Sequence, residues 1–510
     1  GVTMDFSIFL LHRYQEEKEL RSNNEEAMVS AICKTMTSIS ASSLTTIAGF
    51  LALCAMRLTL GRDIGIVMAK GVVLGVLSVI FVLPSMLLLF DSKIAKHRHR
   101  ELIPSMEKLN RHIVQKRGVY IAIFLLLFLP FSVAQNMTEV YYKLDQSLPR
   151  DMASIVANEK LKDEYDMASS HFILVRDDLS SQELSAMERE IQAVDGVTSL
   201  VSYHSILGSG IPDFFVPEEV RSMLKTGGWQ MMMVNSEYTT ATDEVAQQLA
   251  ELQTIVKSHD ESGIITGEAA LTNDLIETSA VDFKTTNYIS IAAIFLIIAI
   301  VFKSLSVPVV LVAAIELAIF INQGIPYFTG TVIPFVSPTI IGCIQLGATV
   351  DYAILMTTRF QEELRSGKDR KEAAIAAATS SDSSILTSAL VLFAATLGVS
   401  VASDIEIIGS ICSMLARGAL ISAAVIILLL PPVLCVCEPV FHRTSIGWRK
   451  PKPVPAESAA LPESAAPEAP KAAAPQAEKR HPHFGRKGKA SIPDEQETTE
   501  KRETVGSGKA

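Results

Sequence analysis

Two aspartates stand inside apolar stretches of this chain, at equivalent positions of a motif that occurs twice. Asp5 lies in Gly-Val-Thr-Met-Asp-Phe and Asp351 in Gly-Ala-Thr-Val-Asp-Tyr, and an arginine (Arg13, Arg359) follows each aspartate by eight residues. An intramembrane carboxylate costs about 2.5–3.5 kcal/mol on insertion scales, so a chain that places one twice is expected to use it. The chemistry that an isolated carboxyl offers there is reversible proton binding.

The spacing to the arginines gives a depth. At about 1.5 Å per helical residue, each aspartate lies about 12 Å above the cytoplasmic boundary, near the middle of a membrane. If the two copies pack face to face, the carboxyls adjoin and titrate as a coupled pair. The alternative is that both aspartates are structural and hydrogen-bonded to serine, threonine or backbone of neighbouring helices.

The elements that must position these carboxyls are apolar helices. The chain has 510 residues, of which 49% are hydrophobic, and a positive mean hydropathy. The first apolar run is only about eleven residues, short of the roughly 20 that span a membrane, so we expect the chain to begin inside a helix. Complete spans are predicted at 36–56, 64–90, 119–135, 286–302, 306–323, 338–358, 383–402 and 405–437.

Charge in the loops sets the orientation. Residues 91–118 carry eight Lys and Arg against three acids, which predicts a cytoplasmic linker. The segment 136–284 then lies outside, with 26 acids against 10 bases. The net charge of −10 argues against nucleic acid as a partner.

The predicted organisation is 1–90, the end of a first transmembrane half; 91–118, the linker; 119–135, a span; 136–284, an extracytoplasmic domain; 285–440, further spans; and 441–510, an Ala/Pro-rich disordered cytoplasmic tail.

Strands alternate with helices in the segment 136–284. Strands are predicted at 171–175, 197–203, 230–234 and 263–266, with helices at 180–193, 217–224 and 241–258. This alternation favours one compact α/β or α+β domain of split βαβ type. The predicted fold class is therefore a polytopic α-helical membrane protein with a duplicated bundle and one inserted extracytoplasmic α/β domain.

Other polar residues in the apolar segments are candidates for contacts inside the membrane. Glu316 is a third buried acid, with Asn322 or Gln345 as candidate partners; substrate contact, proton path and interhelix hydrogen bond are all open. Ser384 lies at the depth of the aspartates.

Three further features have plainer interpretations. Lys70 and Arg417 are interpreted as snorkelling anchors at the outer interface, and Asp382 as a solvated residue near a helix end. The amphipathic stretch 107–114 is expected either on the membrane surface or as a solvated connector.

Sequence patterns of enzymes are missing. The chain has no Gly-x-x-x-x-Gly-Lys-Ser/Thr phosphate loop, no His-Glu-x-x-His and no nucleophile elbow, and its six cysteines form no metal-binding pattern. We therefore expect no enzyme activity, no metal and no cofactor, with a proton gradient as the energy source.

The twin motifs resemble the resistance–nodulation–division (RND) superfamily, most closely its MMPL family, and residues 267–275 resemble that family's exit from its second external domain. The resemblance implies a bundle of two similar halves, of which this chain would hold part of helix four through helix twelve, and a porter-like external domain. It also implies that Asp5 and Asp351 are proton-relay residues and that Tyr352 is a tyrosine partner. Phe6 departs from the family pattern, which has tyrosine there.

The function implied by this resemblance is proton-driven export of amphiphilic or lipid-like molecules, or drugs, across a bacterial plasma membrane. The expected partners are membrane lipids and a small amphiphilic substrate, and a homo-oligomer is left open. Two alternatives stay open as well: a related protein-export or assembly factor, and a sterol- or lipid-sensing receptor without transport.

Overall fold

The structure, a computed structural model, describes residues 4–96, 105–142, 151–207, 218–446 and 448. Long helices dominate it. Eight helical segments of the described chain are long and apolar enough to cross a membrane. They are α2 with the short η1 (Asn24–Ala55), α3 (Thr59–Phe81), α6 (Arg117–Asn136), α12 (Glu268–Phe302), α13 (Ser306–Thr329), α14 (Ser337–Arg365), α15 (Arg370–Ala402) and α16 (Glu406–Thr444).

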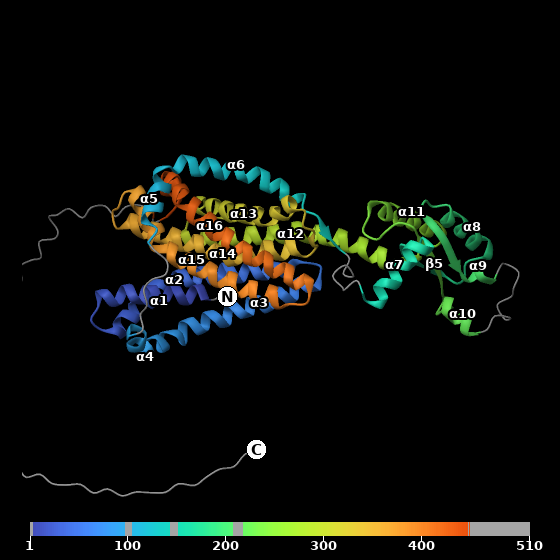
Figure 1. Cartoon of the computed structure of the whole chain (residues 1–510), viewed down its shortest axis with the longest axis horizontal. Coiled ribbons are helices and arrows are strands. Elements are labelled where there is room, and N and C mark those ends of the chain that lie inside the picture. Colours follow the sequence, from blue (N-terminus) through green and yellow to red (C-terminus); the bar gives the residue numbers. More distant parts are fainter. Residues whose placement is uncertain (1–3, 97–104, 143–150, 208–217, 447, 449–510) are drawn as a thin grey trace, which may run out of the picture. The chain divides into compact units, whose positions relative to one another are not determined.

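Helix α14 is the centre of this bundle. In the most apolar 18-residue stretch of α14, 94% is buried, whereas in that of α6 only 6% is buried. Helix α14 is therefore enclosed by protein, and α6 faces outward. Figure 1 shows α14 running among α2, α12, α13, α15 and α16, all of which it contacts. The shorter α1 (Met4–Leu20), which carries the first aspartate motif, packs on α2 and α15.

Glycines bring α2 and α14 unusually close. A Cβ added at Gly49 of α2 would lie 2.8 Å from the Cα of Gly347 in α14. Such small-residue crossings allow two backbones in a membrane to touch. Because Gly347 lies one helical turn before Asp351, this crossing fixes how near α2 comes to the second aspartate.

The predicted span at 64–90 is wrong as a single helix. The structure has α3 and then α4 (Leu83–Lys96), separated at Val82. Pro84 has no N–H to continue the helical hydrogen-bond ladder, which is a sufficient reason for the break. Asp91 of α4 accepts hydrogen bonds from Tyr14, Lys18 and Asn24, and these bonds hold α4 against α1.

Between α6 and α12 lies a segment with a small antiparallel sheet. Its main strands are β2 (Ser169–Arg176), β3 (Val197–Ser202), β5 (Trp229–Ser236) and β6 (Ile264–Gly267), in the order β3-β5-β2-β6. Helix α8 (Ser181–Gln192) connects β2 to β3 and α11 (Asp243–His259) connects β5 to β6. Strand β5 is antiparallel to both neighbours, so β2 and β3 are parallel around it, which is the order of a split βαβ unit.

The remaining described elements of this segment are α7 (Ala153–Tyr165), α9 (Tyr203–Leu207), α10 (Glu218–Leu224) and the two-residue β4 (Lys225–Thr226). Two points tie the segment's ends to the bundle. Strand β1 (Val140–Tyr141) pairs with β7 (Ile333–Pro334), which lies between α13 and α14. Asp282 of α12 is buried and accepts hydrogen bonds from the backbone N–H groups of Arg57 and Leu58, before α3.

The linker helix α5 (Glu107–Gln115) packs on protein, contrary to both interpretations of residues 107–114. Asn110, Ile113 and Val114 are buried, and the helix contacts α15 and α16. Ile113 and Val114 are therefore covered by the bundle, whereas Leu109 of the same helix remains exposed. The predicted disordered tail, 441–510, begins too early, because α16 continues to Thr444 and Phe441 is buried. From residue 449 onward the predicted tail lies outside the described residues.

Candidate functional site

The two aspartates face one small cavity. Its volume is about 40 Å³, which gives room for two or three water molecules at roughly 10–15 Å³ each. Asp351 is buried and Asp5 is half-buried. The lining residues come from α1, α2, α14 and α15: Asp5, Phe6, Phe9, Ser38, Ile39, Ser42, Asp351, Tyr352, Ile354, Leu355, Ser384, Ile385 and Ser388.

The lining repeats the duplication of the sequence. Every lining residue except Ile354 belongs to a pair whose members are 346 positions apart. Equivalent positions of the two repeats thus meet around one space. These pairs are Asp5 and Asp351, Phe6 and Tyr352, Phe9 and Leu355, Ser38 and Ser384, Ile39 and Ile385, and Ser42 and Ser388.

Hydroxyl groups reach each aspartate from the opposite repeat. Ser388 of α15 lines the cavity with Asp5, and Ser42 of α2 lines it with Asp351. Thr46 Oγ1 lies 3.3 Å from Asp351 Oδ2, but it is also 3.0 Å from the carbonyl oxygen of Gly347. Since one hydroxyl has one hydrogen, Thr46 divides its bond between these acceptors. The carboxyls therefore have hydroxyl groups nearby without any cation at bonding distance among the described residues.

Tyr352 contributes an unused hydroxyl. Its side chain is buried, and its Oη has no hydrogen-bond partner within the described part of the chain. A buried polar atom of this kind is ordinarily satisfied, by water where protein is not available. Because the cavity has room for water beside Asp5 and Asp351, a water molecule could join Tyr352 to either carboxyl.

His12 extends the site toward the charged end of α1, and the sequence interpretation missed it. Ser384 Oγ lies 2.9 Å from His12 Nδ1, so a cavity-lining hydroxyl is joined to an imidazole. His12 is seven residues after Asp5, which is two helical turns along the same face. This spacing from Asp5 was the signal in the sequence that could have indicated His12. The signal was weak because His12 is not repeated: the equivalent position in the second repeat is Thr358.

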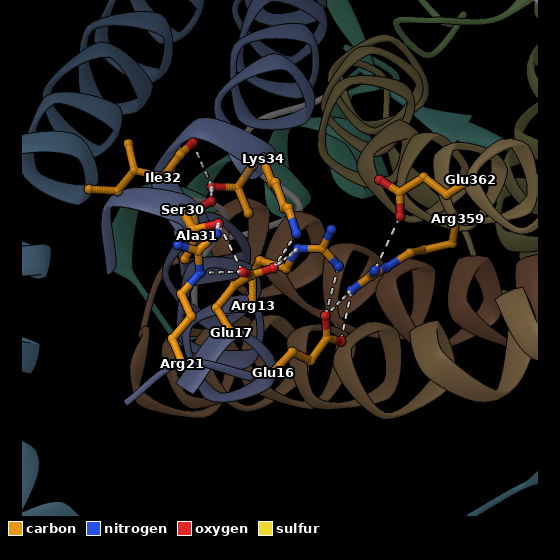
Figure 2. A network of polar contacts seen from close by, with 11 residues as sticks. Arg13, Glu16, Glu17, Arg21, Ser30, Ala31, Ile32, Lys34, Arg359 and Glu362 are labelled. Atoms are coloured by element: carbon orange, nitrogen blue, oxygen red, sulfur yellow. Dashed lines mark hydrogen bonds and ion pairs between the residues drawn. The ribbon is translucent and has the colours of Figure 1, made fainter. Parts of the chain in front are cut away.

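Beyond His12, ionic contacts join the two motifs. Arg359 of α14 donates to Glu16 of α1 at 2.9 and 3.2 Å, and Arg13 donates to the same Glu16 at 2.7 Å. Figure 2 shows Glu16 between the two arginines and Glu17 beside it, bonded to Arg21, Ser30 and Lys34. Surrounding cations lower the pKa of Glu17 to about 2, with the hydrogen bond from Lys34 the largest cause.

Two predicted polar contacts lie elsewhere. Gln345 does not line the cavity that holds the aspartates; its Oε1 accepts from Asn322 and its Nε2 donates to Ser422. Glu316 is buried, and within the described residues its Oε1 has no hydrogen-bond partner. No bond joins Glu316 to Asn322 or Gln345 in this part of the chain. Asp5, Asp351, Tyr352 and Ser384 therefore come together, whereas Glu316 and Gln345 do not join them.

Two interpretations of charged residues are wrong. Arg417 is not a snorkelling anchor, because its guanidinium donates to the side-chain and backbone oxygens of Asn322 at 2.9 and 3.0 Å. Asp382 is not solvated, because it is 1% exposed and accepts from Asn110 of α5. Both errors have one cause: partners far apart in sequence cover these groups. Lys70 is exposed, as expected for a residue at a membrane interface.

A second cavity is lined, like the first, by residues of α14 and α15. It has a volume of about 230 Å³ and lies among α3, α14, α15 and α16. Its lining is uncharged, with Gln345, Thr349 and Thr396 among apolar side chains. It could therefore receive an apolar group but offers no counter-ion.

These features define a polytopic helical membrane protein with duplicated acidic helices, and comparison with known proteins identifies the family. The MMPL family model matches residues 1–116 and 146–454, so the chain belongs to the MMPL family. YdgH of Bacillus subtilis, described as a membrane protein, is 28% identical over 52% of this chain and 30% of its own length.

Two other relatives agree with this assignment. ActII-3 of Streptomyces coelicolor, also described as a membrane protein, is 24% identical over 77% of this chain and 54% of its own length. MmpL6 of Mycobacterium tuberculosis, described as a transport protein, is 24% identical over 34% of this chain and 44% of its own length. The matched region thus spans about a third to half of these relatives.

Proposed function

We propose that this chain belongs to a proton-driven exporter of RND type, which moves amphiphilic or lipid-like molecules or drugs out across a bacterial plasma membrane. The observation that carries the proposal is the single cavity that Asp5 and Asp351 share, lined by paired positions of the two repeats. A family relative described as a transport protein supports it. The role is not enzymatic, and no cofactor is needed besides the proton gradient.

The chemistry would be proton binding and release in this cavity. Burial disfavours the charged form of a carboxyl, and a nearby cation would offset this effect. Only hydroxyl groups lie near these two carboxyls, so each would bind a proton more readily than a carboxyl beside a cation. Tyr352 and the serines would pass protons through cavity water, and Ser384 with His12 would form a route toward the charged end of α1. Changing the charge of the pair would then alter how the two halves pack.

The energy available is adequate. At ~150 mV, one entering proton releases roughly 3.5 kcal/mol, which supports two to three decades of gradient in a neutral substrate. The uncharged second cavity is compatible with an apolar part of such a substrate. In this proposal membrane lipids surround the bundle, residues 136–284 form a porter-like domain outside, and 441–510 lie in the cytoplasm.

The test is proton flux through the full-length protein in liposomes, followed with a pH-sensitive dye. Asp5→Asn and Asp351→Asn should each abolish a flux that the wild type shows. Asp404→Asn, at an exposed position before α16, is the matched control and should retain it. Flux that survives both substitutions would exclude the proton coupling, and ligand binding without flux would favour a lipid- or sterol-sensing receptor.

A further inference from the structure

A buried amide and a buried carboxyl meet between the linker helix and the bundle. Asn110 of α5 is fully buried and Asp382 of α15 is 1% exposed. Asn110 Nδ2 donates to Asp382 Oδ2 at 2.6 Å and lies 3.3 Å from Thr379 Oγ1. Helix α5 leads through Lys116 directly into α6, so this contact holds the connection between the two halves of the chain.

Each of these two residues has one oxygen that no donor satisfies. Within the described residues, Asn110 Oδ1 and Asp382 Oδ1 are buried and have no hydrogen-bond partner. An ionised carboxylate only accepts hydrogen bonds, whereas a protonated carboxyl carries one donor. A proton on Asp382 Oδ1 would supply the donor that Asn110 Oδ1 lacks. The pair would then form two opposed hydrogen bonds, as an amide and a carboxylic acid do.

The surroundings also favour the neutral form. No ion pair joins Asp382 to another residue in the part of the chain that the structure describes, and a buried charge is costly unless it is paired. The charged groups of the elements packed on α15 are exposed or bond to other residues. Those of α5 and of the start of α15 are exposed, His12 of α1 bonds to Ser384, and Arg359 of α14 bonds to Glu16 and Glu362. At the end of α16, His442 and Arg443 are exposed and Glu438 is half-buried.

We propose that Asp382 is a further proton-binding carboxyl, separate from the cavity of Asp5 and Asp351, and that its proton holds the linker helix α5 against α15. Ile113 and Val114 of α5 are buried in the same contact, so the proton adds to apolar packing that exists without it. Loss of the proton leaves Asn110 Oδ1 and Asp382 Oδ1 as two acceptors without a donor, and α5 loosens. This proposal does not depend on proton-driven transport.

Hydrogen exchange of the peptide covering residues 105–116 tests it, in full-length protein in lipid nanodiscs over about pH 5 to 9. At each pH, the measured exchange rates are divided by the intrinsic rate of an unprotected amide, which gives the opening equilibrium of α5. In the wild type, the opening equilibrium of α5 should rise tenfold per pH unit over the pH range in which Asp382 is protonated while α5 is packed but ionised once α5 has opened, because opening then releases one proton; above that range it should level off. Asp382→Asn should show no such slope, since its amide N–H replaces the carboxyl proton as a donor to Asn110.

The control and a second readout keep the test decisive. Asp404→Asn, exposed and remote from α5 in sequence, should behave as the wild type. Infrared spectroscopy should show a protonated-carboxyl C=O band that is lost in Asp382→Asn and shifted in Asn110→Val. If Asp382→Asn does not fold, the shift of this band in Asn110→Val is the test. Equal exchange slopes in wild type and Asp382→Asn, or no band that responds to either substitution, would overturn the proposal.

Discussion

Gly49→Ala offers a direct test of how α2 and α14 position Asp351. The new Cβ would lie 2.8 Å from Gly347 Cα, whereas carbon atoms pack at about 3.5–4.0 Å, so the helices must separate by about 0.7 Å. A separation of that size would stretch the 3.0 Å bond from Thr46 Oγ1 to Gly347 O to about 3.7 Å, beyond hydrogen-bond range. The contact beside Asp351 would then be lost.

The magnitude follows from three opposing effects. Overpacking costs typically 1–3 kcal/mol, the lost hydrogen bond about 0.5–1.5 kcal/mol, and the better helix propensity of alanine returns about 0.5–1 kcal/mol. We expect a net loss of about 0.5–4 kcal/mol, which is roughly a twofold to nearly thousandfold fall in the folding constant.

The assay is reversible unfolding of the protein in mixed micelles, followed by circular dichroism. Gly71→Ala on α3 is the matched control, because its Cβ would meet nothing within 4 Å, and it should not destabilise. Gly347→Ala should be milder than Gly49→Ala, since its nearest contacts would lie at 3.4 Å. The reasoning fails if Gly49→Ala is as stable as Gly71→Ala.

Two further predictions concern residues away from the cavity. Asp282→Asn should destabilise the fold by about 1.5–3 kcal/mol, because the bonds from the N–H groups of Arg57 and Leu58 lose their charge assistance and one accepting oxygen becomes an NH2 donor. Asp274→Asn, at an exposed position of α12, should not destabilise it; thermal unfolding in detergent compares the two. Glu17, whose pKa is lowered, contributes stability that is present above pH 4.5 and is lost as pH falls toward 2. Glu17→Gln should remove that acid-induced loss, Glu19→Gln on the exposed side should retain it, and identical acid titrations of the two variants would contradict the assignment.

What the sequence could predict follows from local pattern. Apolar length was enough to find the spanning helices, and the repeated motif was enough to pair Asp5 with Asp351, because each signal can be read within one segment. The partners of Asp382 and Arg417 could not be found in this way. Asn110 is 272 positions from Asp382 and Asn322 is 95 from Arg417, and only packing of separate helices brings them together. Sequence distance to the nearest charged end therefore gave the wrong environment for both.

The cavity is symmetric in position but not in chemistry. Phe6 stands where the other repeat has Tyr352, so one member of that pair has no hydroxyl. His12 has Thr358 as its equivalent, and Thr46, beside Asp351, has Leu392. In the proposed relay, the side chains that could pass a proton are therefore not duplicated along with the aspartates. The two carboxyls of one duplicated motif would then not be chemically equivalent, although they share one cavity.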